Sequence, residues 1–135
     1  MPSPQPPASA PAAKRGRVLL LEDDDDTRRV LCRLLETRAF EVTAVATVAE
    51  AWDRSSSARF DLLLSDIGLP DGDGYRLMRE LQDLQGLKGI ALTGYGLEDD
   101  VALSREAGFA VHITKPVQIQ LLDAALDQLF PRRAG

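Results

Sequence analysis

Cysteine and histidine are almost missing from this sequence, with one of each, Cys32 and His112, among 135 residues. A lone cysteine excludes a disulfide within the chain and suits a reducing compartment, so we expect a cytoplasmic protein. Because Cys32 lies in an apolar helical stretch, we expect a small core residue rather than a nucleophile. No apolar run approaches the ~18 residues that span a bilayer, and no signal-peptide pattern opens the chain. We therefore expect no membrane as a partner.

Basic residues are also fewer than acidic ones. The sequence has 16 lysines and arginines and 21 aspartates and glutamates, which gives a net charge of −5. A chain of this charge repels phosphate backbones, so we expect no nucleic acid among its direct partners. The Gly-Lys-Ser/Thr triplet of a P-loop is absent from the sequence as well. We therefore do not expect the chain to bind ATP for its own phosphorylation.

The chain divides into a short N-terminal segment and one domain. Residues 1–15 are rich in proline and alanine and predict a disordered tail or an interdomain linker. Residues 16–131 have the size of one ordinary domain. At this length the chain buries roughly two-thirds of its unfolded surface and needs no disulfide or metal to fold.

Apolar and amphipathic segments alternate along this domain and predict five strands and five helices. The predicted strands are residues 17–21, 40–46, 60–66, 88–94 and 110–114. The predicted helices are residues 27–38, 47–58, 74–84, 97–108 and 117–130. The second helix opens with Thr47 and has Glu50 three residues later, the spacing of a capping box. Three of the strands are almost wholly apolar, which indicates an α/β fold with a parallel sheet covered on both faces.

Polar residues follow the predicted strands where each strand ends. Glu22 and Asp23 follow the first strand, Asp66 ends the third, Thr93 lies near the end of the fourth, and Lys115 follows the fifth. The carboxyl ends of parallel strands share one edge of the sheet, where ligands bind in such folds. Three carboxylates this close need a counter-charge, and oxygen ligands favour Mg²⁺. A carboxylate beside Mg²⁺ is a competent phosphoryl acceptor.

Four motifs at these strand ends, "LLLEDD", "LLLSDIGLPDGDGY", "IALTGYG" and "HITKPV", resemble in order and spacing those of response-regulator receiver domains, the CheY-like family. The resemblance covers residues 17–130 and implies a doubly wound, flavodoxin-like, three-layer fold with strand order 2-1-3-4-5. It implies Asp66 as the phosphoacceptor that becomes 4-aspartylphosphate. It also implies a Mg²⁺ site formed by Glu22, Asp23 and Asp66 with the backbone carbonyl of Gly68.

The same resemblance assigns the other strand-end residues. It makes Thr93 the switch hydroxyl and Lys115 the cation that contacts the phosphoryl group, with a cis Lys115-Pro116 bond. His112 stands where the family often has tyrosine or phenylalanine. We expect it to be a surface-facing switch residue rather than a metal ligand or a phosphodonor. Tyr95 could supply part of a contact surface.

The function implied is that of a phosphoacceptor in two-component or phosphorelay signalling. The donor would be a histidine kinase or a histidine phosphotransfer domain, because the only histidine of this chain lies in a predicted strand. We expect no enzyme activity beyond the self-catalysed transfer to Asp66. The phosphorylated domain would bind a downstream protein, or a second copy of this chain, through its fourth helix, fifth strand and fifth helix. We lean towards a receiver of the hybrid-kinase type over a single-domain regulator.

Two alternatives accompany this interpretation. A pseudo-receiver would keep the fold and act only as a protein-interaction module, although the complete set of strand-end residues argues against it. A haloacid-dehalogenase-like phosphatase would need a second aspartate where Gly68 stands. The remaining acidic residues read as structural: the run Asp24–Asp26 as a solvated helix start with one capping residue, and Asp71 and Asp73 as turn residues.

Overall fold

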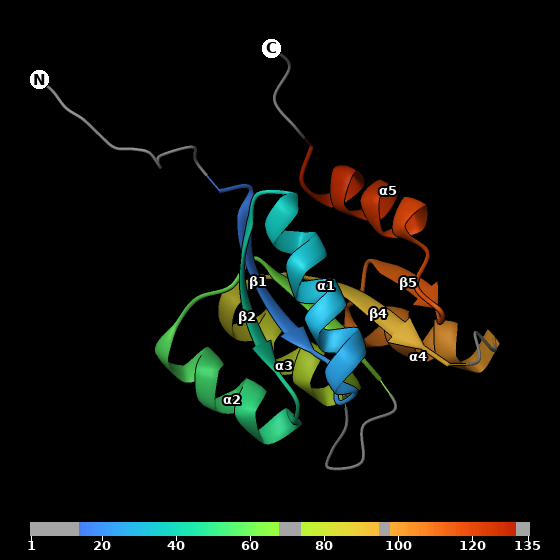
Figure 1. The fold of residues 1–135 in the computed structure, drawn as a ribbon. Coiled ribbons are helices and arrows are strands. Elements are labelled where there is room, and N and C mark those ends of the chain that lie inside the picture. Colours follow the sequence, from blue (N-terminus) through green and yellow to red (C-terminus); the bar gives the residue numbers. More distant parts are fainter. Residues whose placement is uncertain (1–13, 68–73, 95–97, 132–135) are drawn as a thin grey trace, which may run out of the picture.

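A computed structural model describes residues 14–67, 74–94 and 98–131, in which strands and helices alternate along the chain (Figure 1). The strands are β1 (Gly16–Leu21), β2 (Phe40–Val45), β3 (Leu62–Asp66), β4 (Lys88–Thr93) and β5 (Val111–Thr114). The helices are α1 (Asp25–Thr37), α2 (Val48–Ser57), α3 (Gly74–Gln85), α4 (Glu98–Ala107) and α5 (Ile119–Leu129). All ten elements lie where the sequence predicts them, and no end differs by more than two residues.

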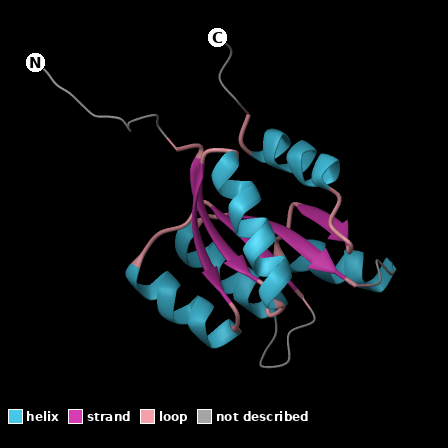
Figure 2. Cartoon of the chain, in the orientation of Figure 1, coloured by secondary structure: helices cyan, strands magenta, loops and turns pink. Residues whose placement is uncertain are grey.

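The five strands form one sheet in the order β2-β1-β3-β4-β5, and every neighbouring pair is parallel. The predicted fold class and strand order are thus confirmed. Helices cover both faces of this sheet (Figure 2). The strand order reverses between β1 and β3, and the carboxyl ends of these two strands therefore flank the place where a ligand binds in such a sheet.

The alternation of side chains along the strands divides the core into two. One core lies between the sheet and α2, α3 and α4, and the other between the sheet and α1 and α5. Leu19 and Leu21 of β1 belong to the first core, and Val18 and Leu20 to the second. A strand buried on both faces has no position for a polar side chain, which explains its unbroken apolar run.

Local hydrogen bonds fix where the helices begin and end. Asp24 caps α1, because its Oδ2 accepts a hydrogen bond from the Thr27 backbone N–H at 2.9 Å. The acidic run therefore contains the capping residue that the sequence predicts. Gly108 follows α4 with a φ of +110°, a conformation that glycine adopts without steric cost.

Thr47 caps α2 as the sequence predicts, and the Glu50 side chain bonds the N–H one residue before the N-cap. The Glu50 backbone N–H donates to Thr47 Oγ1 at 3.1 Å, and Glu50 Oε1 accepts from the Ala46 N–H at 3.1 Å. We expect Thr47→Ala to lower the free energy of unfolding by about 1 kcal/mol, because one helix-end N–H loses its acceptor. Urea denaturation measures the change. Ser56→Ala on the same helix is the control and should stay within about 0.5 kcal/mol of the wild type.

Contacts of Arg15 join the start of the domain to its end. Its Nη2 donates to the Phe130 carbonyl at 2.9 Å and pairs with Asp127 Oδ1 at 3.0 Å. Its guanidinium also lies over the Phe40 ring, 4.8 Å from the centroid. The entry into β1 and the exit from α5 are therefore held together, at the edge of the sheet opposite to the carboxyl ends of the strands.

Candidate functional site

Three carboxylates meet at the carboxyl ends of β1 and β3. One carboxylate oxygen from each of Glu22, Asp23 and Asp66 lies within 4.8 Å of the others. The pairing of β1 with β3 produces this cluster, because neighbouring parallel strands end side by side. Glu22 is fully buried, Asp66 is 8% exposed, and Asp23 is open to solvent. One member of the cluster is therefore accessible from outside, while the other two are buried.

Lys115 enters the cluster from the end of β5. Its Nζ lies 2.7 Å from Glu22 Oε1 and 3.0 Å from Asp66 Oδ2. The contact with Glu22 is an ion pair, because its geometry is not that of a hydrogen bond. The Lys115 backbone N–H donates to the Thr93 carbonyl at 2.7 Å, and the Lys115-Pro116 peptide bond is cis, as the resemblance implies.

Burial and charge act on this cluster in opposite directions. Burial raises the pKa of the Glu22 carboxyl, and the ion pair with Lys115 and the hydrogen bond from the Asp24 N–H only partly offset it. Burial alone would lower the pKa of the Lys115 ammonium, but the two carboxylates beside it outweigh that effect and raise it. Lys115 therefore stays charged at neutral pH.

The donor set fits a hard divalent cation. Three carboxylates face one ammonium, which leaves a surplus of negative charge at this edge of the sheet. Oxygen-only ligands with a solvent-facing side suit Mg²⁺, which keeps several of its waters. The acidic cluster can therefore hold a metal ion. Gly68, which the sequence predicts as a backbone ligand, lies outside the described residues, as do Asp71, Asp73 and Tyr95.

Thr93 lies at the end of β4, next to this cluster in the sheet, and is 4% exposed. Its Oγ1 is 3.0 Å from His112 Nε2 on β5. His112 is half-buried. The expectation that His112 faces the surface is therefore only partly met, because one nitrogen of its ring contacts the buried Thr93 hydroxyl.

Arg28 is a neighbour of the cluster that the sequence did not single out. Its Nη1 donates to the Glu22 carbonyl at 3.0 Å, and its Nη2 pairs with Asp25 at 2.6 Å. The spacing of Asp25 and Arg28 on one helix predicts their ion pair. The contact with the Glu22 carbonyl depends on how α1 packs against the end of β1, and a helical pattern carries no such information.

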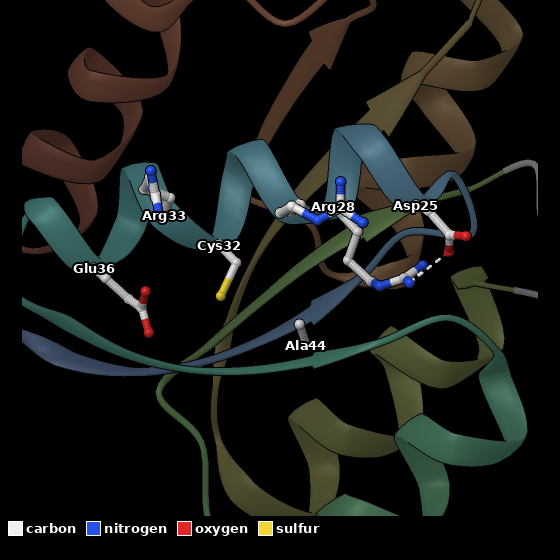
Figure 3. A pocket seen from close by; sticks show the side chains of 7 residues that line it. Asp25, Arg28, Cys32, Arg33, Glu36 and Ala44 are labelled. Carbon is white, nitrogen blue, oxygen red and sulfur yellow. Dashed lines mark hydrogen bonds and ion pairs between the residues drawn. The ribbon is translucent and has the colours of Figure 1, made fainter.

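Cys32 lines a pocket between α1 and β2 (Figure 3). Five charged side chains of α1 contribute to its lining, those of Asp25, Arg28, Arg29, Arg33 and Glu36. The Cys32 thiol is half-buried, and burial raises its pKa, with the Glu36 carboxylate adding to the effect. This environment is that of a packed thiol and not of an activated nucleophile.

We expect Cys32 to react slowly with iodoacetamide. Because the thiolate is the reactive form and folding raises the thiol pKa, the onset of alkylation should shift to higher pH in the folded protein than in urea. Rates measured by mass spectrometry across a pH series test this. Equal rates in the folded and unfolded protein would contradict the buried environment. Glu36→Gln should move the onset part of the way back.

No helix in the described part of the chain is both long and apolar enough to cross a membrane. The expected absence of a membrane partner and the location in a cell both stay predictions.

Sequence and structure comparisons converge on one family. The model of the response regulator receiver domain matches residues 18–127. The response regulator receiver protein CpdR of Brucella abortus is 33% identical over 118 residues, which cover 84% of this chain and 96% of the relative. A crystal structure of a CheY-like receiver domain protein from Methanospirillum hungatei has a TM-score of 0.77 and 32% identity, covering 87% of this chain and 94% of that one.

Other relatives are longer than this chain. The swarming motility regulation protein RssB of Serratia marcescens is 34% identical over 119 residues, which cover 87% of this chain and 54% of the relative. The chain thus spans about half of this relative's length. The match covers the segment that contains all three carboxylates and Lys115.

Proposed function

The chain belongs to the family of response-regulator receiver domains, and we propose that it takes a phosphoryl group from a phosphohistidine onto Asp66. The observation that carries the proposal is the meeting of three carboxylates and one ammonium at the point where the strand order reverses. Asp66 is the member of this group that ends the central strand, and its Oδ2 already contacts Lys115.

In the transfer, an Asp66 carboxylate oxygen attacks the phosphorus in line with the nitrogen that leaves. The new P–O bond forms as the P–N bond breaks, and its electron pair departs with the donor imidazole. Lys115, whose Nζ lies 3.0 Å from Asp66 Oδ2, would stabilise the negative charge on the phosphoryl oxygens. Thr93 would bond a phosphoryl oxygen through its hydroxyl.

We propose that Mg²⁺ occupies the carboxylate cluster, held by Asp23 and Asp66 with Glu22 and the carbonyl of Gly68. When bound, the ion neutralises charge on the transferred oxygens. We expect Asp23→Asn to weaken Mg²⁺ binding at least about ten-fold, because an exposed carboxylate ligand becomes a neutral amide. Isothermal titration calorimetry measures the change. Asp53→Asn, which removes an exposed carboxylate of α2, is the control and should bind Mg²⁺ like the wild type.

The function itself is tested with a small phosphodonor. The protein is incubated with acetyl phosphate and Mg²⁺, and its intact mass is compared with that of a sample containing EDTA. One added phosphoryl group, present only with Mg²⁺, supports the proposal. A wild-type protein that gains no mass and does not bind beryllofluoride would instead be a pseudo-receiver that acts through protein contacts alone.

Membership of the family also suggests which proteins donate the phosphoryl group and which bind the domain after phosphorylation. A histidine kinase or a histidine phosphotransfer domain would supply the phosphohistidine. A downstream protein or a second copy would bind the face formed by α4, β5 and α5 after Thr93 and His112 rearrange. One relative, a transcriptional regulatory protein of Escherichia coli, is matched over only 52% of its length. The absence of a nucleic-acid partner therefore stays a prediction from the charge of this sequence.

A further inference from the structure

The backbone that carries the exposed carboxylate of the cluster is held by a guanidinium from α1. Arg28 Nη1 donates to the Glu22 carbonyl at 3.0 Å, and the Asp23 carbonyl lies 3.5 Å from the same nitrogen. Arg28 Nη2 pairs with Asp25 Oδ1 at 2.6 Å (Figure 3). The Arg28 side chain is 23% exposed, so these bonds are partly shielded from water. One side chain thus fastens the loop after β1 to the first turn of α1.

The Asp23 carboxylate depends on this loop for its position. It is open to solvent, and none of the other described residues forms a hydrogen bond with it. The peptide groups on either side of Asp23 are both held. The Glu22 carbonyl accepts from Arg28, and the Asp24 N–H donates to Glu22 Oε2 at 3.1 Å. These two peptide groups therefore set the direction in which the Asp23 carboxylate points.

We propose that Arg28 is a positioning residue that orients the Asp23 carboxylate for the divalent cation. The inference rests on the proposed function, in which Mg²⁺ occupies the carboxylate cluster. Arg28 forms no ion pair with any of the three carboxylates of the cluster, so it acts through the peptide group between Glu22 and Asp23. Loss of a group that orients a metal ligand in this way weakens metal binding by about 10- to 100-fold.

The charge of Arg28, taken alone, predicts the opposite effect. A positive group beside the cluster repels Mg²⁺, so its removal should strengthen binding of the ion. The pair with Asp25 offsets part of this charge. A hydrogen-bonding role depends instead on the planar fork of the guanidinium, which holds two acceptors in fixed directions, whereas the flexible ammonium of lysine does not. The two explanations therefore differ in sign for a neutral substitution.

Calorimetric titration with Mg²⁺ of the wild type, Arg28→Gln and Arg28→Lys tests the inference. We expect Arg28→Gln to bind Mg²⁺ roughly ten-fold more weakly, although it removes a positive charge. Arg28→Lys keeps the charge but loses the fork, and we expect it to bind about three-fold more weakly. Arg29→Gln is the matched control, because it removes the same charge from a residue that pairs with the exposed Asp26. This control should bind Mg²⁺ at least as tightly as the wild type.

The dependence of phosphorylation on Mg²⁺ supplies a second readout, which a purely structural role would not change. At low Mg²⁺ we expect the rate of Arg28→Gln with acetyl phosphate to fall by about the same factor as its affinity for the ion. At saturating Mg²⁺ its rate should return close to that of the wild type, because excess cation restores occupancy of the site. Unfolding midpoints measured without Mg²⁺ show whether each variant is folded.

The outcomes separate this inference from the function on which it rests. A wild-type protein that binds no Mg²⁺ would overturn the proposed function, whose transfer needs the ion, and this inference with it. A folded Arg28→Gln that binds Mg²⁺ as tightly as the wild type, or more tightly, would overturn the role of Arg28 alone. An equal loss in Arg29→Gln would overturn it too, because the loss would not depend on the contact with Glu22. Should Arg28→Gln fail to fold, the affinity of Arg28→Lys decides the question.

Discussion

Asp66→Asn is expected to abolish phosphorylation of the chain. Asparagine has nearly the shape of aspartate, so the end of β3 should keep its structure, but the amide is not a nucleophile towards phosphorus. We expect the rate of phosphoryl incorporation from acetyl phosphate to fall by roughly 10³-fold or more, below detection by intact mass. The wild-type adduct should have the chemistry of an acyl phosphate, which hydroxylamine cleaves.

The control for this experiment is Asp83→Asn, which removes an exposed carboxylate of α3 and should leave the rate unchanged. Beryllofluoride provides a further check, because a wild-type protein that binds it has an intact site. An adduct that persists in Asp66→Asn and survives hydroxylamine would place the modification on another residue. The assignment of the phosphoacceptor would then be wrong.

Lys115→Met is expected to produce the second largest loss. The methionine has a similar length, but it removes the ammonium that contacts both Glu22 and Asp66. Charge on the transferred phosphoryl oxygens then loses one of its stabilising groups, and such losses cost about 10²-fold in rate. The time course of phosphorylation with acetyl phosphate at saturating Mg²⁺ measures the effect.

Lys14→Met is the matched control, because it removes the same charge from an exposed position near the start of β1. Circular dichroism and the unfolding midpoint show whether Lys115→Met still folds, since the substitution leaves a buried Glu22 without its ion pair. A folded Lys115→Met that is phosphorylated as fast as the wild type would exclude the proposed role of the ammonium.

The sequence predicted the positions of the functional groups better than it predicted their contacts. Apolar runs such as Leu62–Leu64 identify buried parallel strands, and the alternation of strands and helices places all their carboxyl ends at one edge. From these two facts alone, Glu22, Asp66 and Lys115 could be assigned to one cluster. The strand order 2-1-3-4-5 and the cis Lys115-Pro116 bond came from the resemblance, because no local pattern specifies either.

Contacts between elements could not be predicted in the same way. The Thr93–His112 hydrogen bond depends on the register of β4 and β5 and on the rotamers of two side chains. Arg38 at the end of α1 pairs with Asp123 of α5 through two hydrogen bonds of 2.9 and 3.0 Å. These two residues are 85 positions apart in the sequence. The periodic spacing of hydrophobic residues predicts helices and strands but not which charged side chains pair between them.

The contacts of Arg15 have a consequence for joining this domain to other proteins. Chain entry and exit are held together by its bonds to Asp127 and Phe130, on the side of the sheet away from Asp66. A neighbouring domain or a fluorescent tag attached at either end would therefore start from the rear of the molecule. The domain could also be inserted into a loop of a host protein, since such insertions need two ends that lie close together. In each case the acidic edge would face outward, open to a docking phosphohistidine.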